Sequence, residues 1–120
     1  MKIDYCKDTG RIAAGVVLFN PDERTTECLN KLLEQVDKVY VFDNNPGLAR
    51  IILPDKLIYL SEGENKGIAY ALNRIMERAK ADGSEWVLTM DQDSILPSGM
   101  VEDFEKHLDN PEIGIICPQV

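Results

Sequence analysis

The spacing of apolar and polar residues divides the chain into short strands and amphipathic helices. Nearly continuous apolar runs, typical of strands covered on both faces, occur at residues 12–19, 38–42, 57–60, 86–90 and 113–117. Apolar residues recur every three or four positions, as on one face of a helix, at residues 29–36, 68–79 and 100–108. Because strand and helix alternate, we predict an α/β fold with a mainly parallel sheet and right-handed crossovers.

Proline and capping residues mark where these elements end. Asn20-Pro21 ends the first run, and residues 22–26 supply acids and caps for the helix that follows. Pro97-Ser98 is predicted to cap the third helix, which Asn110-Pro111 ends. Residues 48–56 offer too few helical positions, so we expect a short or irregular crossover there. Without a repeat, linker or low-complexity tract, residues 1–120 are predicted to form one domain.

Composition and charge narrow the class of ligand. The chain has 120 residues, of which 44% are hydrophobic, and this is enough for a single core. Its 21 acidic and 13 basic residues give a net charge of -8, which disfavours a nucleic-acid groove lined by lysine and arginine. An anionic ligand would need a metal ion or local amides to neutralise its charge.

Cysteine usage and hydropathy bear on the compartment. Cys6, Cys28 and Cys117 are odd in number and lack CxxC spacing, so we expect reduced thiols, with Cys28 packed on a helix. No apolar run approaches the roughly 18 residues of a transmembrane helix, and no signal-peptide pattern is present. The expected location is the cytoplasm, with or without peripheral contact at the inner face of the cell membrane.

Two carboxylates follow the apolar run at residues 86–90. In an extended strand, Asp91 and Asp93 would lie on the same side of the sheet, with Gln92 turned away. Carboxylate oxygens that leave coordination positions open suit Mg²⁺ or Mn²⁺ shared with a phosphate-bearing substrate. The alternative is a polar turn followed by a helix cap, because Asp and Ser also favour those positions.

A second polar cluster, residues 43–47, follows the run at residues 38–42. Its sequence, Asp-Asn-Asn-Pro-Gly, is typical of a turn. The carboxyl ends of strands are also where open α/β sheets bind ligands, so Asp43 is either a turn residue or a ligand contact. No GxGxxG follows the first strand and no Walker lysine motif occurs, which disfavours a dehydrogenase or a P-loop enzyme.

Four motifs occur in order, and together they resemble a known family. They are Phe-Asn-Pro-Asp at 19–22, Phe-Asp-Asn-Asn at 42–45, Glu-Asn-Lys-Gly-Ile-Ala-Tyr-Ala-Leu-Asn at 64–73 and Met-Asp-Gln-Asp-Ser at 90–94. This set resembles the nucleotide-binding half of an inverting family-two glycosyltransferase of the GT-A fold, most of all the bacterial rhamnosyltransferase branch. The resemblance implies a three-layer, Rossmann-like α/β fold with a mainly parallel sheet, here truncated.

The resemblance also implies an activity and its substrates. A sugar would be transferred with inversion from a nucleotide-diphosphate donor to a glycan or lipid-linked acceptor, as in polysaccharide biosynthesis. Rhamnose from dTDP-rhamnose is the donor expected for this branch, and another dTDP- or UDP-linked sugar is the wider possibility. Phe19, Asn20 and Pro21 would line the nucleotide base through their backbone. Asp43, with Asn44 beside it, would accept a hydrogen bond from a pyrimidine N–H.

The remaining motifs imply contacts with the sugar and phosphate parts of the donor. Asn65 and Gly67 would shape the loop beside the base and pyrophosphate, and Asn73 would hold that loop. Asp91 would contact the ribose or the metal. Asp93 would coordinate the Mg²⁺ or Mn²⁺ that bridges the diphosphate, and the metal would stabilise the departing nucleotide diphosphate.

The chain departs from the family in two ways. Leu72 stands where many members have an arginine, so the contact of that arginine with the nucleotide base is not expected here. Members are usually more than twice this long, with the acceptor site and an Asp or Glu general base in the second half. We assign no catalytic residue in this chain, expect the base beyond Val120, and expect the chain to be a fragment of the enzyme.

Two alternatives belong to other functional classes. One is a nucleotide-binding module without turnover. The other is a Mg²⁺-binding signalling receiver, which would require an acidic pair where the first strand ends in Asn20-Pro21.

Overall fold

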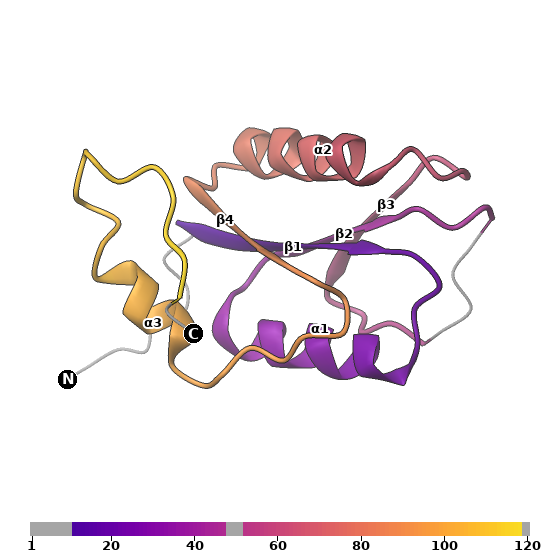
Figure 1. The fold of residues 1–120 in the computed structure, drawn as a ribbon, viewed down its shortest axis with the longest axis horizontal. Coiled ribbons are helices and arrows are strands. Elements are labelled where there is room, and N and C mark those ends of the chain that lie inside the picture. The colour runs from indigo at the N-terminus through magenta and orange to yellow at the C-terminus, as the bar shows by residue number, and fades with distance from the viewer. Residues whose placement is uncertain (1–10, 48–51, 119–120) are drawn as a thin grey trace.

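A four-stranded parallel sheet forms the centre of the computed structural model, which describes residues 11–47 and 52–118 (Figure 1). The strands lie in the order β3-β2-β1-β4. Their bounds are Ile12–Leu18 for β1, Val39–Asp43 for β2, Leu57–Ser61 for β3 and Trp86–Met90 for β4. β1 and β2 are therefore interior strands, whereas β3 and β4 are the edges among the described residues.

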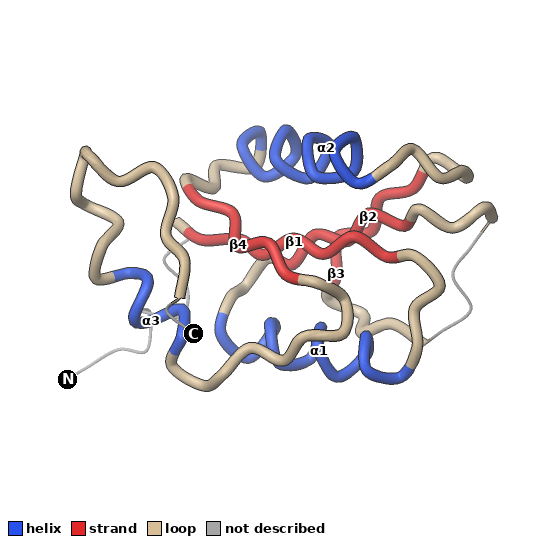
Figure 2. Tube along the Cα trace, viewed as in Figure 1, coloured by secondary structure: helices blue, strands red, loops and turns tan. Residues whose placement is uncertain are grey.

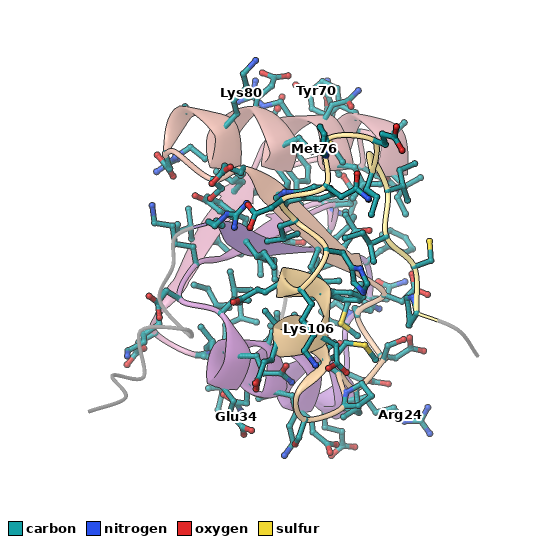
Figure 3. The ribbon with its side chains drawn as sticks, turned by 90° about the vertical axis from the view of Figure 1, so that its left-hand side faces the viewer. Arg24, Glu34, Tyr70, Met76, Lys80 and Lys106 are labelled. Atoms are coloured by element: carbon teal, nitrogen blue, oxygen red, sulfur yellow. The ribbon has the colours of Figure 1, made fainter. Side chains whose placement is uncertain are left out.

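Helices cover both faces of this sheet. The helices are α1 (Glu23–Gln35), α2 (Ile68–Ala81) and α3 (Met100–Glu105). α2 lies on one face, and α1 lies on the other (Figures 1 and 2). Lys80 on α2 and Glu34 on α1 point to opposite outer sides of the molecule (Figure 3). The predicted three-layer α/β architecture is confirmed.

The two ladders of β1 end at different levels. β1 and β2 remain in register through the pair of Leu18 with Asp43. The ladder of β1 with β4 ends earlier, at the pair of Val16 with Met90. Since all the ladders are parallel, the carboxyl-terminal ends of the strands lie at the same end of the sheet. The loops that follow β1, β2 and β4 meet there.

Side chains of the strands alternate between two apolar clusters. Ala14 and Val16 of β1 pack with Leu29 and Leu32 on the side of α1 and α3. All four are fully buried. The N-cap of α1 is Asp22, within the stretch predicted to cap this helix, because Asp22 accepts from Arg24 N–H and forms a capping box with Thr25.

The second cluster lies on the side of α2. Tyr40 and Phe42 of β2 pack there with Ala71 and Ile75. Gly15 of β1 lies under this helix, and a Cβ atom at position 15 would be 2.7 Å from Ile75 Cγ2. A hydrogen atom at position 15 therefore permits the close packing of α2 on the sheet.

Two predictions near the C-terminal end are wrong. The third helix is not capped by Ser98: its N-cap is Gly99, in the left-handed region at φ +82, and the helix ends at Glu105. Residues 113–117 form no strand. Instead, residues 114–118 and β4 line a cavity of about 790 Å³, and Ile115 is 84% exposed. Without ladder partners, β-branched residues alone do not make a strand.

The crossover between β2 and β3 is irregular where it is described. Residues 52–56 contain neither helix nor strand, as predicted, whereas residues 48–51 lie outside the described residues. Across residues 11–47 and 52–118, no helix has the length and apolar content needed to cross a bilayer.

Candidate functional site

A cleft of about 720 Å³ opens where the loops after β1, β2 and β4 meet the start of α2. Its apolar lining includes Val17, Ile68 and Leu72. The residues predicted to bind nucleotide or metal that line it are Phe19, Asn44, Asn65, Gly67, Asp91 and Asp93. The predicted residues that do not line it are Asn20, Pro21 and Asp43. Most of the candidate residues therefore converge, although they come from four separate segments of the chain.

The acids after β4 lie on a turn and not on the strand. β4 ends at Met90, and Ser94 N–H donates to Asp91 O at 3.1 Å across residues 91–94, which we call the acid turn. The expectation that strand alternation would turn Gln92 away from the two carboxylates is wrong, because all the residues of the acid turn line the cleft. The turn alternative considered for this motif describes its backbone correctly.

Both carboxylates of the acid turn are open to solvent. Asp91 and Asp93 are exposed. Within the described part of the chain, neither carboxylate accepts a hydrogen bond or forms an ion pair with a lysine or arginine side chain. The same part of the chain has no group of three or more His, Cys, Asp or Glu side chains able to hold a metal. Two open carboxylates fit Mg²⁺ or Mn²⁺ that takes its other ligands from water and substrate phosphates.

α1 supports the acid turn from below. Cys28 lies on α1, as expected, and its Sγ donates to Asp91 O at 3.6 Å. Burial, together with the negative charges of Asp93 and Asp91, raises the pKa of the Cys28 thiol to about 11. The thiol is therefore neutral at physiological pH and acts here as a weak hydrogen-bond donor.

The three polar residues at the end of β2, Asp43–Asn45, are buried, and the first and third are bonded to each other. Asp43 is fully buried, and its Oδ1 accepts from the main-chain N–H of Asn45 at 2.8 Å and from Asn45 Nδ2 at 2.7 Å. Asp43 Oδ2 accepts from the hydroxyl of Tyr59. We call residues Asp43–Asn45 the asparagine segment. The predicted contact of Asp43 with a base stays a prediction, and the structure gives this carboxylate a second role inside the scaffold.

Asn44 holds the loop that leads into α2. Its Nδ2 donates to Gly67 O at 3.2 Å, and its Oδ1 accepts from Lys66 N–H at 3.1 Å. Asn65 Oδ1 accepts from Gly67 N–H at 2.9 Å, which closes a local turn. Gly67 has φ +86, a conformation that favours glycine. Asn73, expected to hold this loop, is exposed on α2, and Asn44 takes that part instead.

Lys66 is the cation beside this loop. Its Nζ lies 3.0 Å from Glu64 Oε1 and 5.1 Å from the centre of the Tyr70 ring. The hydrogen bond and charge of Glu64 raise the pKa of Lys66, so the ammonium group stays protonated. The carboxylate of Glu64 offsets part of its positive charge.

The sequence analysis missed the contacts of Gln92. Phe19 N–H donates to Gln92 Oε1 at 3.0 Å, and Gln92 Nε2 donates to Phe19 O at 2.8 Å. Residues 19–21, which we call the β1 exit loop, are thus bonded to the acid turn. Only the turn chemistry of Asp-Gln-Asp-Ser hinted that Gln92 would not follow strand alternation.

Comparisons with known proteins show the family of the chain. The family model described as Glycosyl transferase family 2 matches residues 14–120. The chain is 28% identical over 93 residues to the SPbeta prophage-derived glycosyltransferase SunS of Bacillus subtilis (strain 168), covering 73% of this chain and 21% of that protein. It is 30% identical over 114 residues to the dTDP-rhamnosyl transferase RfbF of Shigella flexneri, covering 89% of this chain and 38% of that protein.

These matches span only part of each relative. The chain corresponds to 21% of the length of SunS and 38% of the length of RfbF. No solved structure gives a significant match.

Proposed function

The chain belongs to glycosyl transferase family 2, and from this premise we propose that it forms the donor-binding part of a sugar-transferring enzyme. The donor is a nucleotide-diphosphate sugar, dTDP-rhamnose or another dTDP- or UDP-linked sugar, and the acceptor is a glycan or a lipid-linked glycan. The observation that supports this most strongly is the cleft, which is lined by polar residues from four segments together with apolar residues. The name of RfbF, a dTDP-rhamnosyl transferase, supports the finer choice of donor.

We assign the two ends of the cleft to the two ends of the nucleotide. The backbone of the β1 exit loop, with Phe19, faces the base, and Asn44, Asn65 and Gly67 shape the wall beside it. Asp43 acts on this end through its hydrogen bonds to Asn45 or as the acceptor for a base N–H.

The acid turn faces the diphosphate end. Asp91 and Asp93 would hold a Mg²⁺ or Mn²⁺ ion, and when bound this ion supplies positive charge to the departing diphosphate. The net charge of -8 makes this supply important, because the nearby Lys66 is already paired with Glu64. The acceptor hydroxyl attacks from the face opposite the diphosphate, so the configuration inverts, and a general base takes its proton. We assign that base to no described residue.

Calorimetric titration with dTDP and UDP, with and without Mn²⁺, tests this function. We expect Mn²⁺-dependent binding that Asp93→Ala loses, and the preferred nucleotide narrows the donor. Asp55→Ala is the matched control, because Asp55 is an exposed acid in the turn before β3, at the other edge of the sheet. A folded protein, judged by circular dichroism, that binds neither nucleotide with or without Mn²⁺ would contradict the proposal.

A further inference from the structure

The β1 exit loop is held on one side by a single side-chain amide. The N–H and the carbonyl oxygen of Phe19 are both bonded to Gln92, at 3.0 and 2.8 Å. A residue of a paired strand would offer the same donor and acceptor. The backbone of β4 cannot provide them, because its ladder with β1 ends at the pair of Val16 with Met90. The amide of Gln92 therefore extends the contact between β1 and the segment after β4 beyond the end of the ladder.

The same loop is held on its other side by the asparagine segment. Asn20 N–H donates to Asn45 Oδ1 at 2.9 Å, and Asn44 N–H donates to Leu18 O at 2.8 Å. Asn20 has φ +48, the left-handed region, which asparagine adopts more readily than most residues. Asn45 is itself fixed by Asp43. The loop thus turns sharply between two side-chain amides, those of Gln92 and Asn45.

From this arrangement we infer that Gln92 is a positioning residue, which fixes the base-facing β1 exit loop relative to the acid turn before a ligand arrives. The inference rests on the proposed function and adds that the two ends of the nucleotide site are mechanically joined. Phe19 is 46% exposed and lines the cleft, so its placement depends on the hydrogen bonds of its own backbone. A loop that is ordered in the free protein does not have to be ordered by the ligand, which favours affinity.

Gln92→Ala and Gln92→Met test this inference, and the second variant keeps the volume of the side chain. We expect both to bind thymidine or uridine, whichever nucleoside the wild-type chain prefers, about 5- to 30-fold more weakly, from the loss of two hydrogen bonds. A nucleoside has no phosphate, so NMR titration without metal isolates the base end of the site. Hydrogen exchange at the Phe19 amide should accelerate in both variants, and this readout needs no ligand.

Gln35→Ala is the matched control, because the Gln35 amide also donates one hydrogen bond to, and accepts one from, main-chain groups. Its Nε2 donates to Pro97 O at 2.8 Å, and its Oε1 accepts from Val101 N–H at 3.0 Å. We expect the control to lose stability as Gln92→Ala does, but to keep nucleoside affinity and slow exchange at Phe19.

Three outcomes are decisive. The inference is supported if Gln92→Ala and Gln92→Met lose affinity while Gln35→Ala keeps it. It is overturned, with the proposed function intact, if the wild-type chain binds nucleotide and both Gln92 variants match it, or if exchange at Phe19 is unchanged. If the folded wild-type chain binds no nucleotide or nucleoside, the proposed function fails, and this inference fails with it.

Discussion

The asparagine segment and the acid turn lie on either side of β1 at the carboxyl-terminal end of the sheet, and both begin with an aspartate. Asp43 is fully buried and accepts hydrogen bonds from Asn45 and Tyr59, whereas Asp91 and Asp93 are exposed and, in the described part of the chain, accept none through their side chains. The two segments therefore use the same functional group in different ways. The first builds the scaffold of the site, and the second presents charge to the cleft.

Strand position explains this difference. β2 lies between β3 and β1, and Asp43 is still in register with Leu18 on one side and Ser61 on the other. β4 has β1 as its neighbour on one side, and the acid turn begins where their ladder has ended. A carboxylate inside the ladders of an interior strand is buried and must find donors, while one beyond an edge strand stays in water.

The largest effect should come from breaking the buried side. We expect Asp43→Ala to lower the free energy of unfolding by about 2–4 kcal/mol, because it removes the buried carboxylate that accepts from Tyr59 and from the buried amide groups of Asn45. Urea denaturation followed by circular dichroism measures this loss. Unchanged stability in Asp43→Ala would show that Asp43 is not a scaffold residue.

Substitution in the exposed acid turn should instead weaken ligand binding and leave stability nearly unchanged. Asp93→Asn should weaken Mn²⁺-dependent nucleotide binding at least about tenfold, which corresponds to about 1.4 kcal/mol. Its stability should stay within about 0.5 kcal/mol of wild type, since the side chain is exposed and is not bonded to the scaffold. Calorimetry and urea denaturation of the same preparation separate the two effects. A large loss of stability would place Asp93 in the scaffold and remove the contrast.

A second tyrosine–carboxylate bond sharpens the comparison. The hydroxyl of Tyr40 donates to Asp82 Oδ2 at 2.7 Å, but Asp82 is exposed. Burial and this carboxylate raise the pKa of Tyr40 to about 12, and the hydrogen bond from Tyr40 lowers the pKa of Asp82. Tyr40→Phe should therefore lower stability by less than Asp43→Ala does.

The effect of Tyr40→Phe should depend on pH in a defined direction. The pKa of Asp82 is lower in the folded chain, so its stabilisation is complete above the ordinary value of 3.8 and is lost as pH falls through the folded value. The pKa of Tyr40 is higher in the folded chain, so its stabilisation is complete below 10 and is lost as pH rises toward 12. Urea midpoints of wild type and Tyr40→Phe should differ most between these limits. An equal difference at low pH would contradict this account.

The smallest effect should come from the loop between the two segments. Asn20→Gly keeps the left-handed backbone and should change stability by no more than about 0.5 kcal/mol, whereas Asn20→Ala should lose about 1 kcal/mol. Both variants keep the main-chain N–H that donates to Asn45. Urea denaturation of the pair isolates the conformational term, and equal stabilities would mean that the turn at residue 20 carries no strain.

Much of the fold could be predicted from the sequence because local patterns decide it. The apolar runs of β1 and β2 and the cap at Asp22 depend on neighbouring residues, and the structure confirms them. The prediction of a strand at residues 113–117 was wrong, because a strand also needs a partner strand, which no local pattern indicates.

Most of the residues singled out from the sequence line the cleft, but their hydrogen bonds could not be predicted. Asp91 and Asp93 could be singled out from their place after an apolar run, and they do line the cleft. The role of Gln92 depended on where the ladder with β1 stops, which is a property of two strands together. The burial of Asp43 likewise required the strand order, which places β2 in the interior.

Gly15 lies inside β1 and lines no part of the cleft, yet it sets the spacing between the sheet and α2. Its missing side chain lets α2 pack closely on β1, with Ile75 Cγ2 at 2.7 Å from where a Cβ atom would lie. The first turns of this helix carry Ile68 and Leu72, which form one wall of the cleft. A methyl group at position 15 would act as a wedge under the helix and widen the mouth of the cleft without altering any residue in it. The width of the cleft thus depends on a residue inside the sheet, where a hydrogen atom stands in place of a side chain.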